Sequence, residues 1–342
     1  MVKNSGTVIV TGGCGYIGSH TIVELLDKTD FEVISIDNFV NSSDSTLKRI
    51  EKLTGNEIIN HNIDLRNKDE VQRIFANIPD IKGVIHFAAL KSVPESVVDP
   101  LLYYNNNIQS LLNVLRACQI NKVESFIFSS SCSVYGNVDV FPVNEESKLE
   151  KAESPYGHTK QIGEDITENF SKICDLKTIS LRYFNPAGAH PSGELGELPI
   201  NKPSTLVPVL TMSAQNNSKF TVFGGNLNTR DGSCVRDYVH VMDIASAHIK
   251  ALEYASKNDL QYDVFNLGSG EGVTVLEAIN AFEEKTGIQL NYQIGKPRVG
   301  DVEAIFSDCE KANLKLAWKA ARRIEDIVSS AWLWQQNLKY ND

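Results

Sequence analysis

Short apolar runs alternate with stretches of helical spacing along the first half of this chain. Apolar runs bounded by turn residues are typical of buried strands, and we expect strands at residues 7–10, 32–36, 83–87, 125–128 and 178–181. Apolar side chains recur at three- and four-residue spacing, as in a helix, at residues 21–28, 101–118 and 157–170. This alternation predicts an α/β fold built on a doubly wound parallel sheet.

The pattern weakens after about residue 182. Residues 190–204 are rich in Pro, Gly and polar side chains, which predicts a loop or crossing segment. Shorter candidate strands and helices follow at residues 220–223, 263–267, 275–286 and 324–337. We therefore expect a first domain over residues 1–182. Residues 183–342 are expected to form mainly a smaller, mixed α/β lobe that is interleaved with the first domain.

Charge and cysteine content narrow the class of function. The 342 residues carry 33 Lys and Arg against 43 Asp and Glu, a formal net charge of −10, so we expect no nucleic-acid partner. No apolar run approaches the ~18 residues of a membrane span and no signal peptide is expected, so no membrane association is predicted. The six cysteines are scattered without metal-like spacing. We expect reduced thiols, no metal and a cytoplasmic location.

A glycine-rich turn follows the first predicted strand. The sequence T-G-G-C-G-Y-I-G places Gly12, Gly15 and Gly18 where backbone N–H groups can approach a pyrophosphate at a helix N-terminus. Alone this triplet is a weak signal, but Asp37 ends the second strand at about the 20-residue spacing of dinucleotide sites. A carboxylate there suits ribose hydroxyls and repels a 2′-phosphate. Because Asn38 rather than Arg follows, NAD is favoured over NADP. The alternative is an Asp that only ends its strand.

Other strand ends contribute candidate contacts to the same crevice. Asp64 and Leu65 follow the third strand, and residues 88–91, which include Ala88 and Lys91, follow the fourth. In parallel sheets the carboxyl ends of neighbouring strands line the ligand crevice.

Tyr156, Lys160 and Ser131 form a candidate proton-handling group. Tyr156 and Lys160 are four residues apart and share a helix face, while Ser131 ends a Ser-rich strand. A free tyrosine has a pKa of roughly 10, which a nearby ammonium and a nicotinamide cation would lower. In isolation, Tyr-x-x-x-Lys is more often an ordinary solvated pair. Its position after a dinucleotide turn and the S-S-S strand end favours catalysis.

At these residues the chain resembles the extended short-chain dehydrogenase/reductase superfamily and, within it, the UDP-glucose (UDP-galactose) 4-epimerase family. The resemblance runs nearly end to end. The matching blocks are T-G-G-C-G-Y-I-G-S-H (11–20), I-D-N (36–38), H-F-A-A-L-K-S-V (86–93), F-S-S-S (128–131), S-P-Y-G-H-T-K (154–160), L-R-Y-F-N-P-A-G-A-H-P-S-G (181–193) and V-R-D-Y-V-H-V-M-D (235–243). The last two blocks are the more specific.

The resemblance implies a Rossmann domain that binds NAD and a lobe that binds the UDP-sugar. The implied NAD contacts are Gly12, Gly15, Tyr16, Ile17, Gly18, Asp37, Asn38, Asn41, Ser42, Asp64, Leu65, Phe87, Ala88, Lys91, Asn106, Tyr156, Lys160 and Phe184. The implied UDP-sugar contacts are Ser131, Tyr156, Asn185, Thr205, Phe223, Arg236, Arg298, Asp301 and Ile305. Guanidinium groups suit a diphosphate. Arg236 and Arg298 would otherwise be interpreted as surface ion-pair residues, and Phe223 as core.

The implied reaction is reversible epimerisation at C4 of UDP-galactose and UDP-glucose through a 4-keto intermediate. Tyr156 would be the base for the 4-hydroxyl, Lys160 would tune it and contact the ribose, and Ser131 would relay the proton. The keto sugar would turn about its diphosphate link before hydride and proton return.

Two positions depart from the family pattern. Thr205 stands where an Asn usually contacts the nucleotide. Ile305 stands where residue size governs the hexose pocket: a small residue resembles N-acetyl-tolerant relatives and a Tyr the excluding type. Epimerisation of UDP-N-acetylhexosamines, or of another nucleotide sugar, therefore remains an alternative.

Other functions fit the sequence less well. A sugar-nucleotide dehydratase needs an Asp-Glu pair where this chain has Cys132 and Ser133. A decarboxylase or simple dehydrogenase would release reduced cofactor or another product. A catalytically dead NAD-binding sensor conflicts with the intact Ser131, Tyr156 and Lys160. Finally, the predicted helices at 101–118 and 157–170 resemble the pair through which the family forms two-fold dimers, so a homodimer is expected, unless these faces pack only on their own sheet.

Overall fold

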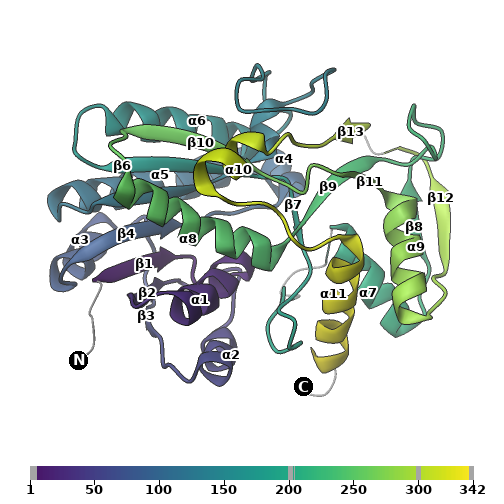
Figure 1. Ribbon diagram of the computed structural model, residues 1–342, viewed down its shortest axis with the longest axis horizontal. Coiled ribbons are helices and arrows are strands. Elements are labelled where there is room, and N and C mark those ends of the chain that lie inside the picture. Colours follow the sequence, from purple (N-terminus) through teal and green to yellow (C-terminus); the bar gives the residue numbers. More distant parts are fainter. Residues whose placement is uncertain (1–5, 199–202, 204, 298–301, 339–342) are drawn as a thin grey trace.

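The computed structural model describes residues 6–198, 203, 205–297 and 302–338 (Figure 1). Seven parallel strands form the central sheet in the order β10-β6-β5-β4-β1-β2-β3. Their bounds are β1 Thr7–Thr11, β2 Glu32–Ile36, β3 Ile59–His61, β4 Ile81–His86, β5 Ser125–Ser131, β6 Lys177–Tyr183 and β10 Tyr262–Leu267. This is the doubly wound α/β fold that the alternating pattern predicts.

Helices cover both faces of this sheet, which explains why its strands are nearly continuous apolar runs. Side chains of α1 (Tyr16–Lys28), α2 (Ser45–Thr54), α8 (Val241–Lys257) and α10 (Glu310–Leu316) pack in one core against residues such as Val8 and Ile127. On the other face, α3 (Lys68–Asn77) and α5 (Pro100–Ile120) enclose a second core with Ile9 and Phe126, and α6 (Pro155–Ser171) packs against its edge. The short helices α4 (Val93–Val98) and η1 (Cys132–Tyr135) follow β4 and β5.

A smaller lobe lies at one end of the central sheet (Figure 1). In it, β9 (Val235–His240) pairs with β7 (Asn185–Ala187), β11 (Gly272–Thr274) and β13 (Ala304–Ile305), and β8 (Phe220–Phe223) pairs with β12 (Tyr292–Gly295). The helices α7 (Leu206–Asn216), α9 (Val275–Thr286) and α11 (Ile324–Leu338) share a core that contains Leu210, Phe282 and Val328. Because β10 and α8 return to the central sheet between these elements, the chain crosses between the two parts more than once.

The predicted elements are confirmed in type, with longer bounds in several cases. The strand expected at 125–128 continues to Ser131, so Ser131 is the last residue of β5 itself. The described part of residues 190–204 contains no helix or strand, as expected. The helix α8 was not predicted. It is amphipathic, with Lys250 and Glu253 paired on its outer face, but it begins directly after β9 with no turn residues between the two elements.

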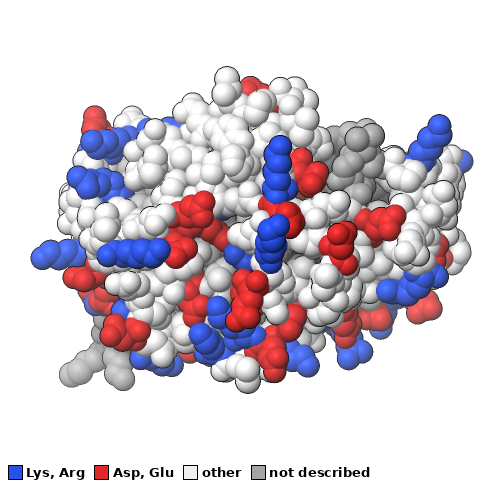
Figure 2. Space-filling view, turned by 90° about the horizontal axis from the view of Figure 1, so that it is seen from above, with Lys and Arg blue, Asp and Glu red and all other residues white. Residues whose placement is uncertain are grey.

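Among the residues that the structure places, no helix combines the length and the apolar character needed to cross a bilayer. On the face seen in Figure 2, Lys and Arg side chains lie among Asp and Glu side chains, so charge of one sign is not concentrated there.

Candidate active site

The glycine turn between β1 and α1 is packed too closely for side chains. Gly12 has φ +69°, and a Cβ there would lie 2.8 Å from the backbone nitrogen of Ala88, which follows β4. A Cβ on Gly18 would overlap the carbonyl oxygen of Gly12. Gly15 is the N-cap of α1, and within the described residues no side chain caps this helix. Its N-terminal N–H groups therefore form a cradle that suits a pyrophosphate.

Asp37 supports this turn from the end of the neighbouring strand. Its Oδ2 accepts a hydrogen bond from the backbone N–H of Cys14 at 3.0 Å. Its Oδ1 accepts one from the Ser42 hydroxyl at 2.7 Å and one from the backbone N–H of Phe39 at 2.9 Å. Asn38 Oδ1 accepts from the N–H of Val40 at 3.3 Å, and Asn41 lies in the same segment. The predicted ribose-binding carboxylate is thus held rigidly beside the glycine turn.

The other predicted NAD contacts follow the ends of neighbouring strands or lie on α1 and α5. Asp64 is paired with Arg66 at 2.5 Å, and these hydrogen bonds hold the pKa of its carboxyl below the usual range, whereas Leu65 is buried. Lys91 pairs with Glu197 at 2.7 Å, and its Nζ lies 5.9 Å from the ring centroid of Tyr16. The remaining contacts lie at the start of α1 (Ile17), after β4 (Phe87 and Ala88), on α5 (Asn106) and after β6 (Phe184).

Ser131, Tyr156 and Lys160 come together where β5 meets α6. Lys160 is 5 % exposed and donates a hydrogen bond to the Ser129 carbonyl oxygen at 2.6 Å. Its Nζ lies 5.8 Å from the ring centroid of Tyr156. The Ser131 hydroxyl accepts a hydrogen bond from the backbone N–H of Ser133 at 3.2 Å. The neighbouring strands β6, β5, β4, β1 and β2 end at Tyr183, Ser131, His86, Thr11 and Ile36, which places the proton-handling group at the same edge of the sheet as the glycine turn.

Burial dominates the electrostatics of this pair. It raises the pKa of Tyr156 to about 12, although the neighbouring Ser131 hydroxyl acts in the lowering direction. It lowers the pKa of Lys160 to about 8, against the raising effect of the Glu164 carboxylate. Lys160 therefore remains an ammonium at neutral pH. A Tyr156 phenolate requires positive charge nearby to outweigh the cost of burying it.

The predicted UDP-sugar residues come from several elements of the smaller lobe. Asn185 begins β7, and its Oδ1 is buried without a hydrogen-bond partner among the residues described. A buried orphan acceptor of this kind suits a ligand donor. Arg236 lies on β9, half-buried, and donates to the Val235 carbonyl oxygen at 2.9 Å. Phe223 ends β8, half-buried, and Thr205 is the exposed N-cap of α7. Arg298 and Asp301 lie outside the described residues.

Ile305 faces the side of the site that β5 and β6 form. It is 7 % exposed and lies opposite Arg236 where β13 pairs with β9. It packs in one apolar cluster with Phe184, Val134 and Tyr135. Since Phe184 follows β6 and Val134 and Tyr135 belong to η1, Ile305 connects the smaller lobe to the wall beside Ser131.

Two residues that shape the site, Asn107 and Asp237, were not among the predicted contacts. Asn107 accepts from the N–H of Leu90 at 2.8 Å and donates to its carbonyl oxygen at 3.0 Å, which fixes the segment after β4. Asp237 accepts hydrogen bonds from the backbone N–H groups of Ser269 and Ser307, which joins loops on both sides of β9. The available signals were the run of three Asn at residues 105–107 and the adjacent charged residues Arg236 and Asp237 within a strand. Within the described chain, no group of three or more His, Cys, Asp or Glu side chains could hold a metal ion.

Comparison with known proteins identifies close relatives. The model of the NAD dependent epimerase/dehydratase family matches residues 8–268. The UDP-glucose 4-epimerase uge1 of Schizosaccharomyces pombe is 44% identical over 98% of this chain and 96% of that relative. The crystal structure of a UDP-glucose 4-epimerase from Bifidobacterium longum in complex with NAD⁺ and UDP matches with a TM-score of 0.93 and 40% identity, over 98% of this chain and 100% of that one. The UDP-glucose-4-epimerase from Stenotrophomonas maltophila, with bound NAD and formylated UDP-arabinopyranose, matches with a TM-score of 0.95 and 39% identity, over the same shares.

Proposed function

Because this chain belongs to the NAD dependent epimerase/dehydratase family, we propose that Tyr156, Lys160 and Ser131 carry out its catalysis. The activity is that of an isomerase: reversible, NAD-dependent epimerisation at C4 of UDP-hexoses, which interconverts UDP-galactose and UDP-glucose through a 4-keto sugar. The observation that carries the residue assignment is the meeting of these three side chains beside the glycine turn, at the carboxyl ends of neighbouring strands.

Tyr156 is the group that removes and returns the proton of the sugar 4-hydroxyl. Its phenol becomes a base only when positive charge offsets its burial, and the Lys160 ammonium supplies part of that charge. Ser131 lies beside Tyr156 at the end of β5, where its hydroxyl can bind the substrate oxygen and pass the proton between that oxygen and Tyr156. NAD, when bound, would supply the hydride acceptor for C4 and, through its nicotinamide, further positive charge near Tyr156.

Residues 1–182 hold the cofactor in this proposal. The N-terminus of α1, which no described side chain caps, and the close approach of Gly12 to Ala88 support a pyrophosphate at the glycine turn. Asp37 supports NAD rather than NADP, since its carboxylate would repel a 2′-phosphate. Asp64 would contact the adenine end of the cofactor only together with its partner Arg66.

Residues 183–342 mainly hold the UDP-sugar. Asn185 Oδ1, which is buried and has no hydrogen-bond partner in the described part of the chain, supports a ligand contact directly after β6, next to Phe184. Arg236 contributes a guanidinium that suits the diphosphate, and Phe223 an aromatic surface for the uracil. Ile305 bounds the hexose pocket, since it packs with Phe184 and Tyr135 beside η1. Thr205, Arg298 and Asp301 complete the proposed set.

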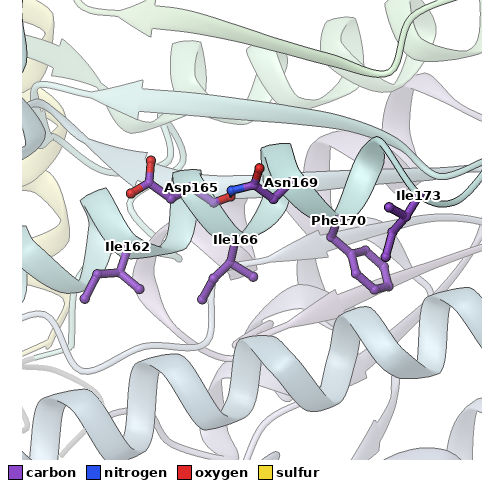
Figure 3. Close-up of a pocket in the computed structure, with 6 residues that line it drawn as sticks. All are labelled: Ile162, Asp165, Ile166, Asn169, Phe170 and Ile173. Carbon is purple, nitrogen blue, oxygen red and sulfur yellow. The ribbon is translucent and has the colours of Figure 1, made fainter.

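We also propose that two copies associate through α5 and α6. The outer face of α6 lines a groove of about 370 Å³ together with Ile173, two residues beyond its end, whose exposed fraction is 74% (Figure 3). On α5, Leu112 and Ile120 are 43% and 55% exposed. The two helices are adjacent and parallel, since Tyr104 near the start of α5 is hydrogen-bonded to His158 near the start of α6. Apolar faces on such a pair suit a four-helix interface about a two-fold axis. A cytoplasmic location is proposed as well, in keeping with six free cysteines.

The deciding experiment is to incubate the purified protein with UDP-galactose without added cofactor and to resolve the products by chromatography. We expect UDP-glucose to form, with NAD that the protein retains serving as the cofactor. Absence of UDP-glucose, even after NAD is added, would overturn the assignment to UDP-hexoses. A parallel incubation with UDP-N-acetylgalactosamine tests the alternative substrate.

A further inference from the structure

A buried ion pair lies directly behind the proton-handling group. Glu164, on α6, accepts hydrogen bonds from Arg182, on β6, in a bidentate arrangement: Nε to Oε1 at 2.9 Å and Nη2 to Oε2 at 2.7 Å. The exposed fractions of the two side chains are 5% for Arg182 and 6% for Glu164. Neither residue belongs to the glycine turn or to the proposed UDP-sugar contacts.

The pair is linked to β5 and η1 by further hydrogen bonds. The Ser130 hydroxyl donates to Glu164 Oε1. Arg182 Nη1 donates to the Tyr135 hydroxyl at 3.0 Å, and that hydroxyl donates to Asn266 Oδ1, on β10, at 2.6 Å. The network therefore joins β5, β6, β10, η1 and α6 at one place.

Its connection to the reacting groups follows from helix spacing. Tyr156, Lys160 and Glu164 occupy successive turns on one face of α6. The β5 residues they approach are also successive: Lys160 donates to Ser129, Glu164 accepts from Ser130, and Tyr156 lies beside Ser131. Glu164 thus fixes the alignment of α6 on β5 one turn from Lys160.

A buried ion pair is weak evidence for a stabilising role. Two charges lose their hydration on burial, and apolar side chains of similar volume often stabilise a fold as well or better. Both carboxylate oxygens of Glu164 accept hydrogen bonds. An ion pair at this position is therefore better explained by its effect on the placement of the neighbouring side chains.

We propose that Glu164 is a positioning residue for the epimerisation, held in place by Arg182, which sets Lys160 and Ser131 against Tyr156. Its carboxylate also places a negative charge one helical turn from Lys160. This rests on the proposed roles of Tyr156, Lys160 and Ser131. The titratable groups that face Lys160 are few. Glu164 and Tyr156 come from α6, and His86 from β4 remains neutral because burial and Lys160 lower its pKa to about 3. From β5, Lys160 meets the Phe128 ring and the Ser129 carbonyl oxygen, while Tyr183 of β6 lies beside Tyr156.

The test compares the pH dependence of kcat for UDP-galactose in the holoenzyme and in Glu164→Gln, from about pH 6 to about pH 10. Without the carboxylate, Lys160 loses its proton at lower pH. The alkaline limb of the profile, in which kcat falls with rising pH, should therefore shift to lower pH by about one pH unit. At neutral pH, kcat should fall about tenfold, with KM within about twofold. Glu164→Asp should restore part of the lost rate. Asp165→Asn, on the outer groove of α6 (Figure 3), is the matched control and should leave the profile unchanged.

Glu164→Gln leaves Arg182 buried without its partner, so folding must be controlled. The double variant Glu164→Leu/Arg182→Met removes both charges and should show the same displacement of the limb. An unchanged pH profile in either variant, when it is folded and contains NAD, overturns the proposal. Failure of both variants to fold also overturns it, because the ion pair would then be needed for folding alone. Tyr156→Phe is measured in parallel to separate the positioning role of Glu164 from the proposed function. Full turnover in Tyr156→Phe would overturn the proposed function itself.

Discussion

The Asp37 carboxylate accepts a hydrogen bond from the backbone N–H of Cys14 at 3.0 Å, which links the end of β2 to the middle of the glycine turn. The residue expected to bind the ribose thus also holds the loop expected to bind the pyrophosphate. Cofactor choice and the shape of the loop therefore depend on one side chain.

Asp37→Asn should weaken NAD binding by about 10- to 100-fold, because a hydrogen bond to a charged group contributes about 1.5–3 kcal/mol. Retained NAD after purification and titration with NAD measure the effect. Asp44→Asn, at an exposed position before α2, is the control and should bind NAD normally. Unaltered NAD retention in Asp37→Asn would argue against the ribose contact.

Tyr156→Phe should reduce kcat by about 10²- to 10⁴-fold, the usual range for loss of a general base. Binding of UDP should change little, since the phenol hydroxyl acts on the hexose. Steady-state rates with UDP-galactose and calorimetric titration with UDP provide the two readouts. Tyr292→Phe, on β12, is expected to behave like the parent protein, and equal rates in both variants would exclude Tyr156 as the base.

Lys160→Met should stabilise the fold at neutral pH while it abolishes activity. Burial lowers the pKa of Lys160 from 10.5 to about 8, so between these values the unfolded chain holds the extra proton. The destabilisation is therefore complete below about pH 8 and is lost as the pH rises towards 10.5. This corresponds to about 3 kcal/mol, of which the lost hydrogen bond to Ser129 offsets about 1.

Urea unfolding of Lys160→Met and the parent, each with saturating NAD, at pH values from about 7 to about 10 measures this difference. The gain should shrink with rising pH. Lys172→Met, at the exposed end of α6, should show no such trend. A difference that does not change with pH would contradict the role of burial.

Ile305→Ser should raise kcat/KM for UDP-N-acetylgalactosamine by about tenfold or more relative to UDP-galactose. The buried Ile305 side chain packs with Phe184 and Tyr135, so its removal enlarges the proposed hexose pocket. The expected range for a change of this size in an apolar pocket is about 1–3 kcal/mol. Ile294→Ser, on the exposed strand β12, is the control. An unchanged ratio would place the N-acetyl discrimination elsewhere.

Ile166→Glu should convert the proposed dimer into a monomer, because it places a charge in the apolar groove of α6 (Figure 3). Light scattering at micromolar concentration distinguishes the two states. Ile294→Glu introduces the same charge at a site 51% exposed in the smaller lobe and should leave association unchanged. A monomeric parent protein would refute the interface.

Local sequence signals were sufficient to locate most strands of the central sheet and the element boundaries at which the proposed site residues lie. Gly12, Asp37, Ser131 and Tyr156 each lie at an element boundary that the apolar pattern predicts to within a few residues. In contrast, α8 was missed because it begins directly after β9, with no turn residues to separate the two elements. The pairing of β9 with β7, β11 and β13 joins segments far apart in the sequence, which no local pattern specifies.

The sequence by itself determined the type of sheet, the glycine turn and the spacing of Tyr156 and Lys160, because each depends on neighbouring residues along the chain. Only the tertiary structure decided that Glu164 and Arg182 meet behind Lys160, that burial sets the pKa of Lys160 to about 8, and that Ile305 reaches Phe184 from a distant strand. These three features depend on packing between elements that are separate in the sequence. Burial at such positions is what gives a charge or a contact a large effect on the free energy.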